Sequence, residues 1–196
     1  MGVRDVFREH LEAVTAASAS LPDVLEAVGK TLQRCLEGGG KILTCGNGGS
    51  AADAQHLASE LVGRVRRHRR ALPAVALTTD ASVLTAIAND YGFSEVFARQ
   101  VRALASPGDV LVAISASGDS ANVVEAARAA RDAGCSVVAL TGRGGGRLAE
   151  HADLLVAAPS DDVCRIQEIH GLCIHAVCEG IEAQAPDAPD EGGTAG

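Results

Sequence analysis

The chain has almost no aromatic residues: Phe, Tyr and Trp make up 2% of its 196 residues, and Trp is absent. Hydrophobic residues still account for 47% of the sequence, so we expect a core built from Ala, Val, Leu and Ile. The sequence also lacks any apolar run near the roughly 18 residues that a membrane-spanning helix needs. Its charged first residues, 1–11, do not form the apolar stretch of a signal peptide. These absences favour a cytoplasmic protein with no membrane contact.

Basic surfaces, disulfide scaffolds and nucleotide motifs are missing as well. The formal net charge of −8 and the pI near 5.2 argue against a general nucleic-acid or anionic-membrane surface. Six cysteines show neither C-x-x-C spacing nor the density of a secreted scaffold, so we expect reduced thiols. No P-loop and no dinucleotide fingerprint follows a predicted strand, so we expect no nucleotide cofactor.

Short apolar runs alternate with helical patterns along the chain. This alternation predicts a three-layer α/β/α sandwich with a five-stranded parallel sheet and two helices before the first strand. The strands are expected at 41–45, 74–79, 109–115, 136–141 and 153–158, and the helices at about 3–18, 22–37, 50–65, 93–105, 120–133, 146–151 and 162–183. We expect one domain over residues 1–184, with N-terminal helices over 1–38 and the α/β core over 39–184. Residues 185–196, rich in Pro, Asp and Gly, are expected to form a disordered tail.

The stretch from Cys45 to Arg64 carries the strongest functional signal. It reads C-G-N-G-G-S-A-A-D-A-Q-H-L-A-S-E-L-V-G-R, so a predicted strand breaks into glycines and a serine and then opens a helix. Glycine lets the backbone approach a ligand closely, and the free N–H groups of a helix N-terminus favour an anion. Ten residues after Ser50, the same helix carries Glu60, one turn beyond His56. The pattern predicts a phosphorylated substrate held beside proton-transfer groups.

A second loop between a strand and a helix reads S-A-S-G-D-S over residues 115–120. Its hydroxyl and N–H groups can donate to phosphate oxygens without placing a mobile charge in the site. Ser and Asp are also ordinary helix N-caps, so this loop alone favours capping and phosphate binding about equally. Because ligands of parallel α/β sheets bind beyond the carboxyl ends of the strands, we expect both loops at one site.

Five sequence blocks resemble the sugar isomerase (SIS) family and, within it, the phosphoheptose isomerases. They are C-G-N-G-G-S (45–50), H-L-A-S-E-L (56–61), N-D-Y-G-F (89–93), S-A-S-G-D-S-A-N (115–122) and R-I-Q-E-I-H (165–170), in family order. The similarity runs from about residue 5 to residue 183. It implies the SIS fold and conversion of the ketose sedoheptulose 7-phosphate into the aldose D-glycero-D-manno-heptose 7-phosphate, the first step of nucleotide-activated heptose biosynthesis. It also implies a homotetramer with its sites at subunit interfaces.

The resemblance assigns roles to individual residues. The reaction moves a proton between carbons 1 and 2 through an enediol, and Glu60 matches the family's base while His175 matches its partner histidine. Some members bind zinc, at positions that match His56, Glu60, Gln167 and His175. Since Gln167 and His175 are about 12 Å apart along a helix, convergence across subunits is a further expectation. Substrate-binding positions match Asn47, Gly48, Gly49, Ser50, Arg64, Asn89, Asp90, Ser115, Ala116, Ser117, Ser120 and Gln167.

Three residues depart from the family pattern. Asp119 stands where the phosphate loop usually has Asn, and its carboxylate would repel a phosphate unless it is turned away. Ala116 occupies a position often filled by Thr, and Cys164 replaces an acidic residue. These changes could weaken affinity or shift the substrate, but they leave the proton-transfer pair intact.

Simpler interpretations compete with these roles. A Glu one turn after a His on an amphipathic helix is usually a solvated pair, His170 is expected to be structural, and Asp80 is expected to cap the following helix. The basic run over 64–70 looks like a nucleic-acid patch, yet the negative net charge favours a solvated segment or a subunit contact.

Two rival functions also stay open. One is a non-catalytic SIS protein that binds a protein partner, like the replication initiator-associating proteins, although those relatives lack the equivalents of Glu60 and His175. The other is an isomerase of a different ketose phosphate.

Overall fold

The computed structural model describes residues 2–185. Seven α-helices, five strands and two 3-10 turns follow one another in this part of the chain. Their order is α1 (Val3–Ser20), α2 (Pro22–Glu37), β1 (Ile42–Gly46), α3 (Gly49–Val62), β2 (Ala74–Ala76), α4 (Ala81–Tyr91), η1 (Phe93–Glu95), α5 (Ala98–Leu104), β3 (Val110–Ser115), α6 (Ala121–Asp132), β4 (Ser136–Thr141), η2 (Gly146–His151), β5 (Leu154–Ala157) and α7 (Val163–Gln184).

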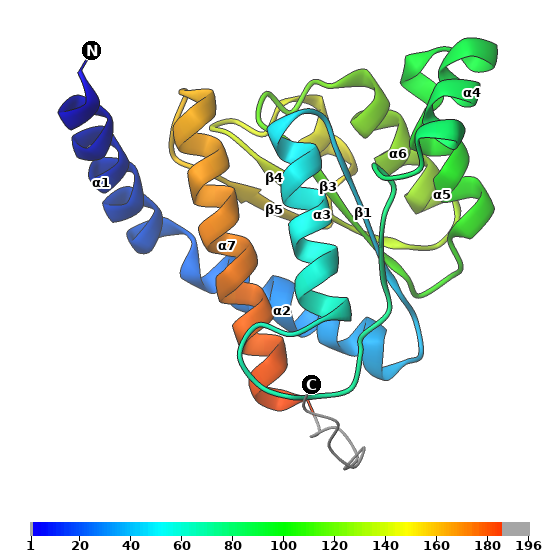
Figure 1. Cartoon of the computed structure of the whole chain (residues 1–196), viewed down its shortest axis with the longest axis horizontal. Helices are drawn as coiled ribbons and strands as arrows, with labels where there is room; N and C mark the ends of the chain where they lie inside the picture. Colours follow the sequence, from blue (N-terminus) through cyan, green and yellow to red (C-terminus); the bar gives the residue numbers. More distant parts are fainter. Residues whose placement is uncertain (1, 186–196) are drawn as a thin grey trace, which may run out of the picture.

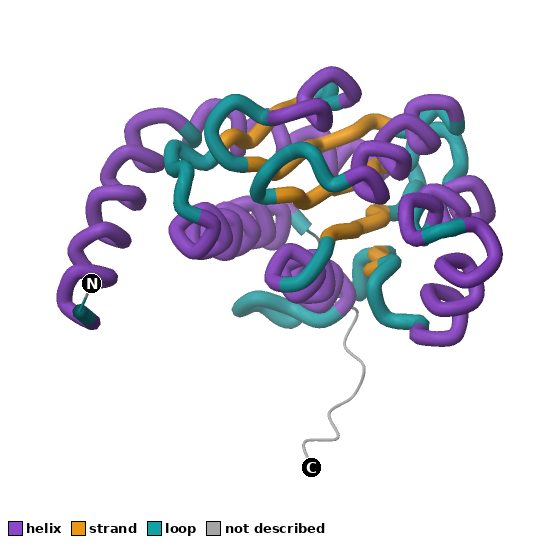
Figure 2. The backbone as a smooth tube through the Cα atoms, turned by 90° about the horizontal axis from the view of Figure 1, so that it is seen from above, coloured by secondary structure: helices purple, strands orange, loops and turns teal. Residues whose placement is uncertain are grey.

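The five strands form one parallel sheet in the order β2-β1-β3-β4-β5. Helices α2, α3 and α7 cover one face, and α5 and α6 cover the other, as the core contacts and the view along the layers show (Figure 2). Helix α1 extends from the side of the molecule and contacts α7 (Figure 1). The predicted three-layer sandwich with a five-stranded parallel sheet and two preceding helices is confirmed.

Aliphatic side chains fill both sides of the sheet. Successive strand residues point to opposite faces, so Ile42 and Val112 pack beneath α3 and α7 while Leu43 and Leu111 pack beneath α5 and α6. All four are buried. Because both faces are covered, the strands read as continuous apolar runs, which is why the sequence pattern located them.

The segment between β2 and β3 differs from the sequence prediction. The expected strand 74–79 is only Ala74–Ala76, because β2 is an edge strand that pairs with β1 alone. Helix α4 was not in the expected set, although its apolar residues Leu84 and Ile87 pack against the core on the α5 and α6 side of the sheet. Gly92, with φ of 90°, ends α4, and the expected helix 93–105 is divided into η1 and α5.

Three other expectations concern the chain as a whole. All six cysteines are free thiols. Over the described residues, no helix combines the length and apolar character needed to cross a membrane. Residues 186–196, most of the expected disordered tail, lie outside the described part of the chain.

Candidate active site

The predicted phosphate-binding residues gather where the chain leaves β1 and β3. These neighbouring strands run parallel, and the chain passes from β1 to α3 on one face but from β3 to α6 on the other face. A crevice opens at such a switch in direction, beyond the carboxyl ends of the strands, and it is the usual ligand site of open α/β sheets. The two polar loops of the sequence, 46–50 and 115–120, flank this crevice.

The first loop depends on glycine. A Cβ at Gly46 would lie 2.5 Å from the carbonyl oxygen of Ser50, so the backbone is folded tightly here. Gly48 adopts φ of 56°, a left-handed conformation that favours glycine, and it begins α3 without a side-chain cap. The first N–H groups of α3 therefore face the crevice without a capping side chain, which is suited to an anion. Ser50 is buried in the first turn of this helix.

The second loop brings three serine hydroxyls together. Ser115 Oγ donates to Ser120 Oγ at 3.0 Å and lies 3.4 Å from Ser117 Oγ. Ser120 is the N-cap residue of α6, but its side chain makes no capping hydrogen bond. By contrast, Asp80 caps α4 and Asp162 caps α7 through hydrogen bonds to backbone N–H groups. The hydroxyl of Ser120 is thus directed to the serine group instead of capping α6, which favours phosphate binding.

The structure accounts for Asp119. Its carboxylate accepts hydrogen bonds from the backbone N–H of Arg147 at 3.0 Å and from the Arg147 guanidinium at 3.4 Å. Arg147 also donates to the backbone oxygen of Asp119 at 2.7 Å. The negative charge is therefore paired, so the expected repulsion of a phosphate is reduced. Sequence reasoning missed Arg147, because its partner lies 28 residues away.

The proton-transfer candidates lie further along α3, opposite α7. His56 Nε2 lies 3.2 Å from Glu60 Oε1, and the rings of His56 and His175 meet edge to face with centroids 4.7 Å apart. One ligand atom from each of the three residues lies within 4.8 Å of the others. The His56 and Glu60 side chains are 33% and 18% exposed, and His175 is exposed. The pair on α3 is therefore part of a three-residue group and not a simple solvated pair.

Gln167 occupies a different place. Its carboxamide lies against Gly49 at the N-terminus of α3, so closely that a Cβ at Gly49 would collide with it. Helices α3 and α7 pack against each other. The distance along α7 from Gln167 to His175, eight residues, is therefore close to the distance along α3 from Gly49 to His56, seven residues. Within one chain Gln167 thus lies at the phosphate end, and its expected metal contact stays a prediction that calls for a neighbouring subunit.

The remaining predicted substrate-binding residues do not gather in one place. Asn47 forms a reciprocal amide pair with Asn122 at 2.8 Å in both directions, which ties the two loops together. Ala116 accepts a hydrogen bond from Gly142 through its backbone oxygen. Three of them are exposed: Arg64 lies beyond α3, and Asn89 donates a hydrogen bond to Asp90 at the end of α4. Cys164, which departs from the family pattern, is also exposed and lies in the first turn of α7.

Asp53 was not among the predicted site residues, although it lies one turn before His56 on α3. Burial raises its pKa to about 6, and the charge of His56 opposes this shift. One carboxylate oxygen of Asp53 is buried without a hydrogen-bond partner. Its position three residues before His56 was the available signal, since i and i+3 residues share a helix face.

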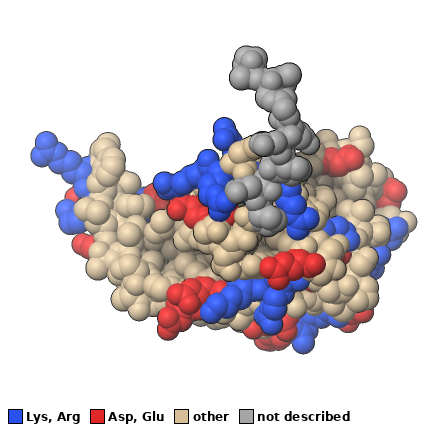
Figure 3. All heavy atoms as spheres, turned by 90° about the horizontal axis from the view of Figure 1, so that it is seen from below, with Lys and Arg blue, Asp and Glu red and all other residues tan. Residues whose placement is uncertain are grey.

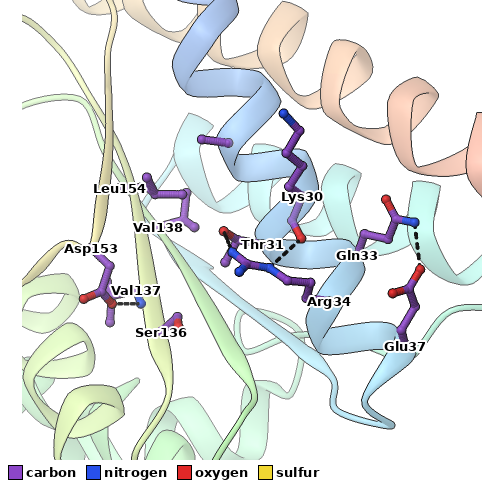
Figure 4. A pocket seen from close by; sticks show the side chains of 11 residues that line it. Lys30, Thr31, Gln33, Arg34, Glu37, Ser136, Val137, Val138, Asp153 and Leu154 are labelled. Carbon is purple, nitrogen blue, oxygen red and sulfur yellow. Dashed lines mark hydrogen bonds between the residues drawn. The ribbon is translucent and has the colours of Figure 1, made fainter.

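A cavity of about 760 Å³ lies elsewhere. Figure 4 shows that α2 and the first residues of β4 and β5 line it, at the amino ends of the strands. Its polar groups hydrogen-bond to one another: Arg34 donates to Thr31, and Val137 donates to Asp153. This cavity holds no acid–base pair comparable to that of Glu60 and His175.

Two expectations about single residues are confirmed. Buried His170 hydrogen-bonds through Nε2 to the carbonyl oxygen of Thr141 at 3.0 Å, as a structural residue would. Asp80 accepts a hydrogen bond from the N–H of Val83 and so caps α4. The expectation for the basic run over 64–70 is wrong at Arg69, which is 6% exposed.

Known proteins resemble this chain over most of its length. Residues 5–142 match the family model described as "SIS domain". A phosphoheptose isomerase from Aliarcobacter butzleri (strain RM4018) is 52% identical over 176 residues, which cover 90% of this chain and 93% of the relative. The solved phosphoheptose isomerase of Neisseria gonorrhoeae is 50% identical, with a TM-score of 0.88 and coverage of 92% of this chain and 97% of that one. The solved enzyme of Francisella tularensis is 40% identical, with a TM-score of 0.90 and coverage of 93% and 97%. The chain therefore belongs to the phosphoheptose isomerase family of SIS-domain proteins.

Proposed function

We propose that this protein, acting as one domain over residues 1–184, isomerises sedoheptulose 7-phosphate to D-glycero-D-manno-heptose 7-phosphate. The observation that carries the proposal is the position of a carboxylate and two imidazoles about two to three helical turns beyond an uncapped, serine-lined helix N-terminus. The isomerase names of relatives at about 50% identity favour this activity over a protein-binding module.

The phosphate end of the substrate would be held by the two loops. The serine hydroxyls and the first N–H groups of α3 and α6 can donate to phosphate oxygens, and the helix dipoles add favourable partial charge. Gln167, beside Gly49, would complete this end of the site. Anchoring the phosphate leaves carbons 1 and 2 of the sugar near Glu60 and His175, and such positioning makes proton transfer effectively intramolecular.

Glu60 and His175 would then move the protons. The Glu60 carboxylate removes a proton from carbon 1 of the ketose while His175 donates a proton to the oxygen on carbon 2, which gives the enediol. Return of a proton to carbon 2 and loss of the proton on oxygen 1 give the aldose. His56, within 3.2 Å of Glu60, would orient the carboxylate between these steps.

Zinc fits the donor set of this group. Two imidazoles and a carboxylate, with ligand atoms within 4.8 Å of one another, resemble a catalytic zinc site with an open position. His56, Glu60 and His175 would hold the ion, which when bound supplies Lewis-acid polarisation of the substrate oxygens. Because a carboxylate that ligates zinc is a weaker base, the two roles proposed for Glu60 compete.

We propose a homotetramer whose subunits complete each other's sites. Val3, Phe7 and Leu11 form an exposed apolar stripe along α1, 75%, 67% and 65% exposed, which suits a contact with another copy of the chain. His175, which the chemistry needs in a site that excludes water, is exposed in the single chain. The free thiols agree with a cytoplasmic location. Light scattering would test the subunit number.

The proposed reaction is tested by incubation of the purified protein with sedoheptulose 7-phosphate, with and without a chelator, and detection of the aldose by NMR. A parallel panel of pentulose and hexulose phosphates tests whether another ketose phosphate is preferred. Aldose formed only from the heptulose phosphate would support the proposal. Turnover of none of the ketose phosphates would contradict it and favour a protein-binding module. Loss of activity with chelator, restored by zinc, would support the metal site.

A further inference from the structure

The basic segment after α3 encloses the end of α7. In Figure 1 the chain that follows α3 passes around the lower end of α7 before it reaches β2. Arg66 forms an exposed ion pair with Glu179 at 2.9 Å, and Arg67 donates to the backbone oxygen of Glu182 at 3.0 Å. Lys and Arg side chains lie among Asp and Glu side chains on the visible surface of this end (Figure 3). This mixture of charges argues against a nucleic-acid surface.

A buried ion pair lies at the centre of this segment. The side chains of Arg69 and Glu182 are 1% and 4% exposed, and Arg69 Nε lies 3.7 Å from Glu182 Oε1. The Glu182 carboxylate accepts hydrogen bonds from three consecutive backbone N–H groups, those of Val65, Arg66 and Arg67, at 2.8–3.0 Å. Burial alone would raise the pKa of Glu182, but these hydrogen bonds and the charge of Arg69 lower it. Glu182 is therefore held in its charged form.

Arg69 connects this pair to the residue that carries the proposed base. Its guanidinium donates to the backbone oxygen of Glu60 at 2.6 Å and to that of Leu61 at 2.8 Å. The last carbonyl groups of a helix have no partners within the helix, and a cation there also interacts favourably with the helix dipole. Arg69 thus caps the C-terminal end of α3 at Glu60 itself.

Glu182, the other member of the ion pair, lies on the same helix as His175. It follows His175 by seven residues on α7, two turns along the helix and near the same face, about 10 Å away. Replacement of a buried ion pair by apolar residues of similar size is often neutral or stabilising, so stability alone is a weak reason for this arrangement. A function in fixing the relative positions of two helices accounts for it better.

On the basis of the proposed isomerase, we infer that Arg69 and Glu182 are positioning residues that hold the C-terminal ends of α3 and α7 together. They thereby set the separation between the Glu60 carboxylate and the His175 imidazole. Neither residue touches the substrate in this scheme. The phosphate cradle, formed by the loops 46–50 and 115–120, lies at the opposite end of both helices. Loss of the Arg69–Glu182 pair should therefore affect the chemical step more than substrate binding.

The test compares Arg69→Met, Glu182→Gln and Arg69→Lys with Arg66→Met. The last variant removes the exposed ion pair from the same segment and serves as the matched control. We expect Arg69→Met and Glu182→Gln to lower kcat by about tenfold or more while KM stays within about twofold, because misplacement by about 1 Å can cost up to 100-fold in rate. Arg69→Lys, which keeps the charge, should recover part of kcat, and Arg66→Met should match the wild type.

An NMR measurement tests the geometry independently of turnover. The ring-proton signals of His56 and His175 report their edge-to-face contact, so Arg69→Met should shift them and Arg66→Met should not. If the wild type turned over none of the ketose phosphates, the proposed function would be wrong. The NMR signals would still show whether Arg69 and Glu182 fix the positions of the two histidines. Wild-type kcat and unchanged ring signals in folded Arg69→Met would overturn the inference.

A third variant covers the case in which the single substitutions do not fold. Arg69→Met/Glu182→Gln leaves no uncompensated buried charge, and the carboxamide oxygen of Gln can still accept from the backbone N–H groups of residues 65–67, so it should fold. Reduced kcat with KM near the wild-type value and shifted histidine signals would support the inference. Wild-type kcat in this double variant would overturn it.

Discussion

The two ends of the α3–α7 pair are built in different ways. At the amino end of α3, backbone groups, glycines and small hydroxyl side chains surround the crevice, and no charged side chain caps α3 or the neighbouring α6. At the carboxyl ends, the buried Arg69–Glu182 pair joins the helices through hydrogen bonds to backbone groups. The proposed proton-transfer residues lie between these ends.

The difference follows from what each end has to do. An anion that enters and leaves is bound well by N–H and hydroxyl groups already in place, because they need little reorganisation. Two helices whose side chains must meet within a few ångströms need a fixed contact, and a buried charge network supplies direction as well as attraction. Substitutions at the two ends should therefore change different kinetic constants.

The largest effect is expected between the two ends, at His175. His175→Gln removes the proposed proton donor but keeps a side chain of similar size, so kcat should fall by at least ~10²-fold with KM nearly unchanged. His151→Gln, on η2 away from α3 and α7, is the matched control and should keep wild-type kinetics. Steady-state measurements with sedoheptulose 7-phosphate check this prediction, and a large rise in KM instead would assign His175 to binding.

The next largest effect is expected in the backbone of the cradle. Gly118 has φ of 72°, and a Cβ there would collide with the backbone of Gly145, so Gly118→Ala should lower the free energy of unfolding by about 2–3 kcal/mol. Gly39 has φ of 80° but open space around it, so Gly39→Ala should lose only about 1 kcal/mol. Denaturant unfolding of both variants measures the difference. Equal losses would show that the loops do not constrain each other.

A smaller effect is expected at the serine hydroxyls. Ser115→Ala should raise KM for the sugar phosphate about tenfold, as expected for loss of a hydrogen bond to a charged group, and should change kcat little. Ser18→Ala on α1, which removes an exposed hydroxyl outside the crevice, is the control. If Ser115→Ala changes mainly KM and the Arg69 variants change mainly kcat, the two ends of the α3–α7 pair have the different functions proposed here. A fall in kcat without a rise in KM for Ser115→Ala would remove that difference.

The smallest effect concerns the pH dependence of stability. Burial lowers the pKa of His170, although its hydrogen bond to Thr141 opposes this shift. The folded state therefore favours the neutral ring, while the unfolded chain binds a proton near pH 6.5, so stability is lost as pH falls below this value. His170→Gln keeps an N–H donor but does not titrate. Between pH 6.5 and 5.5 it should lose about 1 kcal/mol less than the wild type in denaturant unfolding, and parallel curves would contradict the prediction.

The sequence predicted the cradle better than the carboxyl ends, for a physical reason. The glycine and serine pattern that forms each loop lies within six consecutive residues, so local reading located it, together with the strands buried on both faces. Arg69 and Glu182 are 113 residues apart, and nothing near Arg69 distinguishes it from the exposed arginines beside it. Asp119 shows the same limit, because its pairing with Arg147 depends on the packing of two loops. Helix α4 is a miss of a different kind, since Leu84 and Ile87 recur at helical spacing and pack against the core.

The most direct test of the proposed chemistry is the rate of aldose formation from sedoheptulose 7-phosphate by the wild type and by Glu60→Gln. The substitution keeps the size of the side chain and removes the carboxylate that takes the proton, so we predict a fall in kcat of at least ~10²-fold. Circular dichroism and thermal unfolding would establish that the variant is folded. A rate near that of the wild type in folded Glu60→Gln would contradict the central claim.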